Sequence, residues 1–106
     1  MAVGEEKLNE IVRRIIQVAQ PLRVVLFGSA ARGTETSRSD LDILIVVKDG
    51  SHRRKVAQNV YRSFSGIGVA TDIVVVTESD VAKYRDVPWM VIKPAFDEGK
   101  DLYVAA

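Results

Sequence analysis

The chain has 106 residues, so we expect a single domain over residues 1–106 and no second catalytic domain. Its 47% hydrophobic and 27% charged residues are typical of a folded globular protein, not of a disordered segment. Fifteen Lys and Arg residues against 14 Asp and Glu residues give a net charge of only +1, so direct nucleic-acid binding is not expected. The absence of cysteine excludes disulfides and thiolate chemistry and suits a reducing cytoplasm, and a single histidine argues against a zinc cluster.

The N-terminal half predicts one helix and two strands. Apolar residues recur at helical spacing over Glu5–Gln20, and Pro21 ends that pattern. Leu22–Phe27 and Leu41–Val47 are β-branched and apolar, which predicts buried strands. The longest apolar stretch lies inside the second strand and is far shorter than the roughly 20 residues that cross a bilayer, so we expect no membrane segment. The charged N-terminus likewise does not resemble a signal peptide.

The C-terminal half continues the alternation of helices and strands. Ser51 is the expected N-cap of a helix that extends to about Phe64, and either Thr77 or Ser79 is expected to start a short helix after the third strand. Pro94 predicts a kinked or broken helix over 88–96, which Gly99 ends. The remaining predicted elements are strands over Val69–Val76 and Leu102–Val104. Together these elements predict an α+β fold, a mixed β-sheet with helices packed on it.

Three aspartates lie at the starts of apolar strands. Asp40 and Asp42 are two residues apart, so on a strand their side chains share a face, and Asp72 lies near the start of the third strand. Carboxylates held close together repel one another and therefore need a cation or a proton. A site with only oxygen ligands favours magnesium. If the two strands pair side by side, the three carboxylates can hold two metal ions.

A turn upstream of these aspartates offers groups that bind anions. Gly28 and Ser29 follow the first strand, and a glycine lets the backbone approach a ligand closely while a serine supplies a hydroxyl. Arg32, one turn further on, can add positive charge. A phosphate group is the ligand that this combination fits.

The spacing of these residues resembles a known family signature. Gly28-Ser29, ten intervening residues and Asp40-x-Asp42 resemble the GS-x10-DxD motif of DNA polymerase β-like nucleotidyltransferases. The run Leu26–Val47 further resembles the minimal nucleotidyltransferases (MNT) that act as antitoxins of HEPN toxins. The resemblance implies a polymerase β palm-like nucleotidyltransferase fold. It also implies transfer of AMP from ATP, with two Mg²⁺ ions, to a hydroxyl of a HEPN partner, typically a tyrosine.

The same resemblance implies a role for each residue. Asp40 and Asp42 would bind both metals, and Asp72 would bind the catalytic metal and assist removal of the acceptor proton. Gly28 and Ser29 would hold the β- and γ-phosphates. Because larger family members add a second domain for the acceptor, a complex with another protein is expected, either with the toxin or with further copies of the chain.

Two other functions fit the same residues. The chain could be an antitoxin that neutralises its partner by binding alone, or a transferase subunit that acts on a small hydroxylated molecule. The remaining polar residues have simpler interpretations: His52 is expected to be an exposed residue at a helix start, and the basic run Arg53–Lys55 a solvated helix face.

Overall fold

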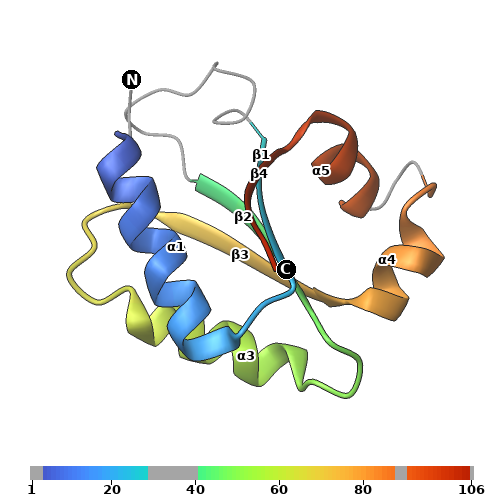
Figure 1. Ribbon diagram of the computed structural model, residues 1–106, viewed down its shortest axis with the longest axis horizontal. Helices are drawn as coiled ribbons and strands as arrows, with labels where there is room; N and C mark the ends of the chain where they lie inside the picture. Colours follow the sequence, from blue (N-terminus) through green and yellow to red (C-terminus); the bar gives the residue numbers. More distant parts are fainter. Residues whose placement is uncertain (1–3, 29–40, 88–90, 106) are drawn as a thin grey trace.

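The computed structural model describes residues 4–28, 41–87 and 91–105 (Figure 1). The described elements confirm the predicted alternation of helices and strands. In chain order they are α1 (Glu5–Ala19), β1 (Arg23–Phe27), β2 (Leu41–Val47), α3 (Arg53–Ser63), β3 (Thr71–Thr77), α4 (Glu78–Tyr84), α5 (Ile92–Glu98) and β4 (Lys100–Val104). Among these described helices, none has the length and apolar character that crossing a bilayer requires.

Within the described ranges, four strands form one sheet in the order β3-β2-β1-β4. Strand β2 pairs in parallel with β3, whereas β1 is antiparallel to both β2 and β4. The sheet is therefore mixed, as the sequence predicts. One consequence of this topology is that β1 ends at the same edge of the sheet at which β2 and β3 begin.

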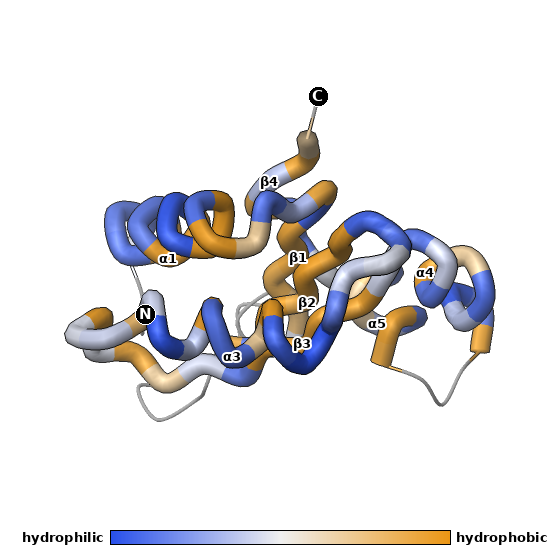
Figure 2. Tube along the Cα trace, turned by 90° about the horizontal axis from the view of Figure 1, so that it is seen from below, coloured by the Kyte–Doolittle hydropathy of each residue, from blue (hydrophilic) through white to orange (hydrophobic). Residues whose placement is uncertain are grey.

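Helices cover both faces of the sheet. Figures 1 and 2 show α1 and α3 on one side of the strands and α4 and α5 on the other. Alternate side chains of β2 enter the two apolar clusters, so this strand is buried on both faces. The cluster on the α1/α3 face contains Ile11, Ile15, Val24, Leu26, Leu41, Ile43, Ile45, Val47, Val60, Phe64 and Ile67. The cluster on the α4/α5 face contains Val25, Leu44, Val46, Val76, Ile92 and Ala95.

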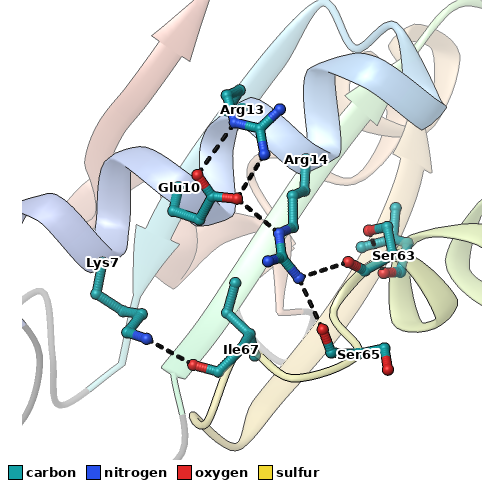
Figure 3. Close-up of polar contacts among 8 residues, drawn as sticks. Lys7, Glu10, Arg13, Arg14, Ser63, Ser65 and Ile67 are labelled. Atoms are coloured by element: carbon teal, nitrogen blue, oxygen red, sulfur yellow. Dashed lines mark hydrogen bonds and ion pairs between the residues drawn. The ribbon is translucent and has the colours of Figure 1, made fainter.

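Polar side chains of α1 tie this helix to the end of α3 and the turn that follows it (Figure 3). Arg14 donates hydrogen bonds to the carbonyl oxygens of Ser63 and Ser65, at 2.8 and 3.0 Å, and Lys7 donates to that of Ile67 at 2.7 Å. The last carbonyls of a helix lack partners inside the helix, so Arg14 satisfies groups that would otherwise need water. Hydrogen bonds from the neighbouring arginines on α1 lower the pKa of Glu10 to about 2.

Two details of the helices differ from the expectation. The N-cap of α3 is His52, not Ser51, because the His52 Nδ1 atom accepts a hydrogen bond from the backbone N–H of Lys55. Pro94 does not break α5, contrary to the expected kink. It is the third residue of that helix, where a backbone N–H has no partner within the helix, so its missing donor removes no bond. Gly99 ends α5, as expected.

The start of α4 settles the alternative that the sequence leaves open. Thr77 is the N-cap, and its side chain accepts a hydrogen bond from the backbone N–H of Asp80. Asp80 in turn accepts one from the backbone N–H of Thr77, which completes a capping box. The capping box turns the chain sharply from β3 into α4.

Candidate active site

The end of β1 and the starts of β2 and β3 meet at one end of the sheet, which is called the site edge below. In the sheet register Phe27, the last residue of β1, lies opposite Asp42, and Asp42 lies opposite Asp72. The predicted site requires β2 and β3 to pair side by side, and the parallel register confirms that they do. Two of the three predicted aspartates are therefore nearest neighbours across adjacent strands, which lie about 4.8 Å apart.

The two aspartates share a face of the sheet. Side chains alternate along a strand, so Asp42 lies on the same face as Leu44, and Asp72 on the same face as Val74. Leu44 belongs to the apolar cluster on the α4/α5 face, and Val74 packs against that cluster. Asp42 is half-buried and Asp72 is exposed. Two carboxylates on strands this close together repel one another, and this repulsion favours a cation between or beside the two groups.

The turn after β1 lies directly against one of these carboxylates. Gly28 has φ +73°, a left-handed conformation that favours glycine. A Cβ atom added to Gly28 would overlap the Oδ2 atom of Asp42 and lie 3.2 Å from its Cγ atom. Position 28 must therefore lack a side chain for the backbone to lie against the Asp42 carboxylate. The structure thus brings together Gly28 and Asp42, two residues of the predicted motif that are separated by 13 others in the sequence.

The other predicted site residues, Ser29, Arg32 and Asp40, lie outside the described residues. Among the residues that are described, no cluster of three or more His, Cys, Asp or Glu side chains is placed to hold a metal. The described pair, Asp42 and Asp72, offers the hard oxygen ligands that Mg²⁺ prefers. Its donor chemistry therefore fits a magnesium site that a further carboxylate would complete.

The start of α3 contributes no group to this edge of the sheet. His52 is exposed and serves as a helix cap. Arg53 forms an ion pair with Asp80 at 2.8 Å, close to the opposite end of β3, and Arg54 and Lys55 are exposed. These positions confirm the expected solvated helix face.

One contact beside the aspartate pair involves Tyr61, a residue for which the sequence predicts no role in the site. The hydroxyl of Tyr61, on α3, accepts a hydrogen bond of 2.9 Å from the backbone N–H of Ile73, the residue after Asp72. The side chain of Tyr61 remains 46% exposed. An exposed tyrosine on an amphipathic helix carries no sequence signal for such a contact, because the partner is a backbone group of a distant strand.

Similar sequences are found among protein families and among curated proteins. The family model for the nucleotidyltransferase domain matches residues 5–102. A curated relative from Methanocaldococcus jannaschii, named as a candidate protein adenylyltransferase, MJ1305, is 33% identical over 66 residues. That match covers 57% of this chain and 45% of the relative, so it reaches less than half of the relative's length.

Solved structures share the fold. A toxin–antitoxin complex with AMP-PNP contains a chain that superposes with a TM-score of 0.62 at 23% identity, covering 92% of this chain and 73% of the other. A complex of a tri-AMPylated Shewanella oneidensis HEPN toxin with an MNT antitoxin gives a TM-score of 0.60 at 19% identity, covering 95% and 72%. These similarities confirm the expected fold.

Proposed function

Because the chain belongs to the nucleotidyltransferase domain family, we propose that it transfers AMP from ATP to a hydroxyl group of a partner protein. The observation that carries this proposal is the contact set at one sheet edge, where Asp42 lies beside Asp72 and against the backbone of Gly28. The turn of Gly28 and Ser29 would bind the β- and γ-phosphates, and Arg32 would add positive charge there. The α-phosphate would then lie near the aspartates.

In this proposal Asp40, Asp42 and Asp72 hold two Mg²⁺ ions. Bound Mg²⁺ stabilises the negative charge that develops on the entering and leaving oxygens during phosphoryl transfer. Asp72 also assists removal of the proton from the acceptor hydroxyl. The acceptor oxygen forms a bond to the α-phosphorus as the bond to the β-phosphate oxygen breaks, so pyrophosphate leaves.

The proposed acceptor is a tyrosine of a HEPN toxin, and the chain acts as the antitoxin in the cytoplasm. Two findings support a HEPN toxin as the acceptor protein. The curated relative is named as a candidate protein adenylyltransferase, and one of the similar folds is an MNT antitoxin in complex with an AMPylated HEPN toxin. The charge balance agrees, because a net charge of +1 gives no general attraction to nucleic acid as an alternative acceptor.

The test is transfer of label from α-labelled radioactive ATP to a co-purified HEPN partner in the presence of Mg²⁺. Asp42→Asn and Asp72→Asn should each lower the labelling rate by about 100-fold or more, because each removes a charged metal ligand. Asp101→Asn is the matched control: Asp101 also lies on a strand, but its partner is Arg23, near the opposite end of β1. Mass spectrometry should find the added AMP on a tyrosine of the partner.

Three outcomes would contradict the proposal. Undiminished labelling in Asp42→Asn and Asp72→Asn would refute the assigned site. If these variants neutralise the toxin fully without labelling it, the chain acts by binding alone. Turnover of ATP with a small hydroxylated molecule, and none with the protein partner, would assign the chain to small-molecule transfer.

A further inference from the structure

The outer edge of β3 is held by a side chain of α3. Among the described strands, β3 is the last on its side of the sheet, so alternate backbone groups along it face away from β2. Leu41 N–H donates to the carbonyl oxygen of Ala70, a bond that directs the backbone groups of Ala70 and Asp72 toward β2. The N–H of Ile73 therefore faces outward, and the Tyr61 hydroxyl accepts its hydrogen bond at 2.9 Å.

The two strands that carry the aspartates differ in how firmly packing holds them. Strand β2 is buried over five consecutive residues that follow Asp42. In β3 only Val76 is buried, and Asp72 itself is exposed. The position of Asp42 is therefore fixed by the core, whereas the position of Asp72 depends on an edge strand with less packing around it.

Helix α3 supplies contacts near both ends of this edge strand. Tyr61 binds the backbone next to Asp72, and Arg53, near the first turn of α3, forms an ion pair of 2.8 Å with Asp80 of the capping box that follows β3. Figure 1 shows α3 packed beside β3, and this arrangement lets one rigid helix bind both segments. Of the two contacts, only that of Tyr61 lies at the site edge of the sheet.

We propose that Tyr61 is a positioning residue for Asp72. Its hydrogen bond fixes the backbone at Ile73 and thereby sets where the Asp72 carboxylate lies relative to that of Asp42. Without the hydroxyl, the Ile73 N–H would bind water and the start of β3 would sample a wider range of positions. The inference rests on the proposed function, in which the two carboxylates share metal ions.

The test is Mn²⁺ binding in the presence of ATP, measured by electron paramagnetic resonance on the intact chain. Tyr61→Phe keeps the half-exposed ring and removes only the hydroxyl, and it should weaken Mn²⁺ binding by about 3- to 10-fold. Ser63→Ala is the matched control, since the Ser63 hydroxyl donates within the same helix, to the carbonyl oxygen of Val60, at 2.7 Å. This control should bind Mn²⁺ as the wild type does.

Hydrogen exchange gives a second readout that does not depend on metal binding. The Ile73 amide should exchange faster in Tyr61→Phe than in the wild type or in Ser63→Ala, because only the first variant lacks its acceptor. Unchanged exchange at Ile73 would overturn the inference, as would equal Mn²⁺ affinity in Tyr61→Phe and Ser63→Ala.

Asp72→Asn separates failure of this inference from failure of the proposed function. If Asp72→Asn binds Mn²⁺ as tightly as the wild type, Asp72 holds no metal and both proposals are wrong. If Asp72→Asn loses Mn²⁺ affinity while Tyr61→Phe keeps it, the assigned site stands and only the positioning role is refuted.

Discussion

Replacing Gly28 by alanine tests whether the turn after β1 must lie against the Asp42 carboxylate. The added methyl group would meet two separate obstacles. The backbone has φ +73°, a conformation that costs an alanine about 1–2 kcal/mol. The Cβ atom would also overlap the Asp42 Oδ2 atom, so the carboxylate would have to rotate or the turn would have to move away.

Gly66→Ala separates these two effects. Gly66 has φ +77°, nearly the same as Gly28, yet an added Cβ there would meet no atom within 4 Å. Both variants should lose about 1–2 kcal/mol of unfolding free energy from the backbone conformation. Gly28→Ala should lose about 1 kcal/mol more, because a side chain forced from its preferred rotamer costs roughly that amount.

The decisive measurement is nucleotidyl transfer at a temperature where both variants are folded. Gly66→Ala should retain wild-type activity. Gly28→Ala should lose about 100-fold, because a shift of the order of 1 Å at a reacting group has an effect of that size. Urea denaturation of both variants supplies the unfolding free energies. Equal activity of the two variants at matched stability would refute the argument that the contact between Gly28 and Asp42 serves the reaction.

Two further predictions concern stability. Arg14→Ala should lower the unfolding free energy by about 1–3 kcal/mol, because the carbonyls of Ser63, at the end of α3, and of Ser65, in the turn that follows, would lose their charged donor. Arg13→Ala removes only an exposed ion pair and should change the unfolding free energy little. Similar unfolding curves for the two variants would contradict this. A hydrogen bond from the Thr77 N–H and, to a smaller extent, the contact with Arg53 lower the pKa of Asp80 below its ordinary value of 3.8. The Asp80 carboxylate therefore stabilises the fold above pH 3.8, and this stabilisation is lost as the pH falls through the lowered pKa. Asp80→Asn should therefore be less stable than the wild type at pH 7 and lose less stability on acidification below pH 4, and parallel curves of stability against pH would contradict the assignment.

The sheet face on which each described aspartate lies follows from the sequence, because side chains alternate along a strand. Each aspartate lies on the face opposite to that of its immediate neighbours in the strand. The faces of Asp42 and Asp72 are therefore known once the strands are known. The relation between the two strands is not local. Spacing predicts that the carboxylates can meet, but only the parallel register makes Asp42 the direct neighbour of Asp72.

The details that the sequence does not predict depend on contacts between distant segments or on single-residue geometry. Ser51 and His52 are adjacent, and either can cap a helix; the backbone conformation of the turn decides between them. Pro94 disrupts a helix interior but not a first turn, so its effect depends on where α5 begins. Tyr61 gains its role only because α3 packs along the edge of β3.

Because β2 is buried on both faces, the packing of the fold and the proposed chemistry depend on different side chains. The cluster on the α1/α3 face takes the β2 side chains that alternate with Asp42, and neither Asp42 nor Asp72 belongs to it. Substitution of the exposed Asp72 side chain therefore leaves that cluster intact. A chain that loses the Asp72 carboxylate can therefore keep the same scaffold.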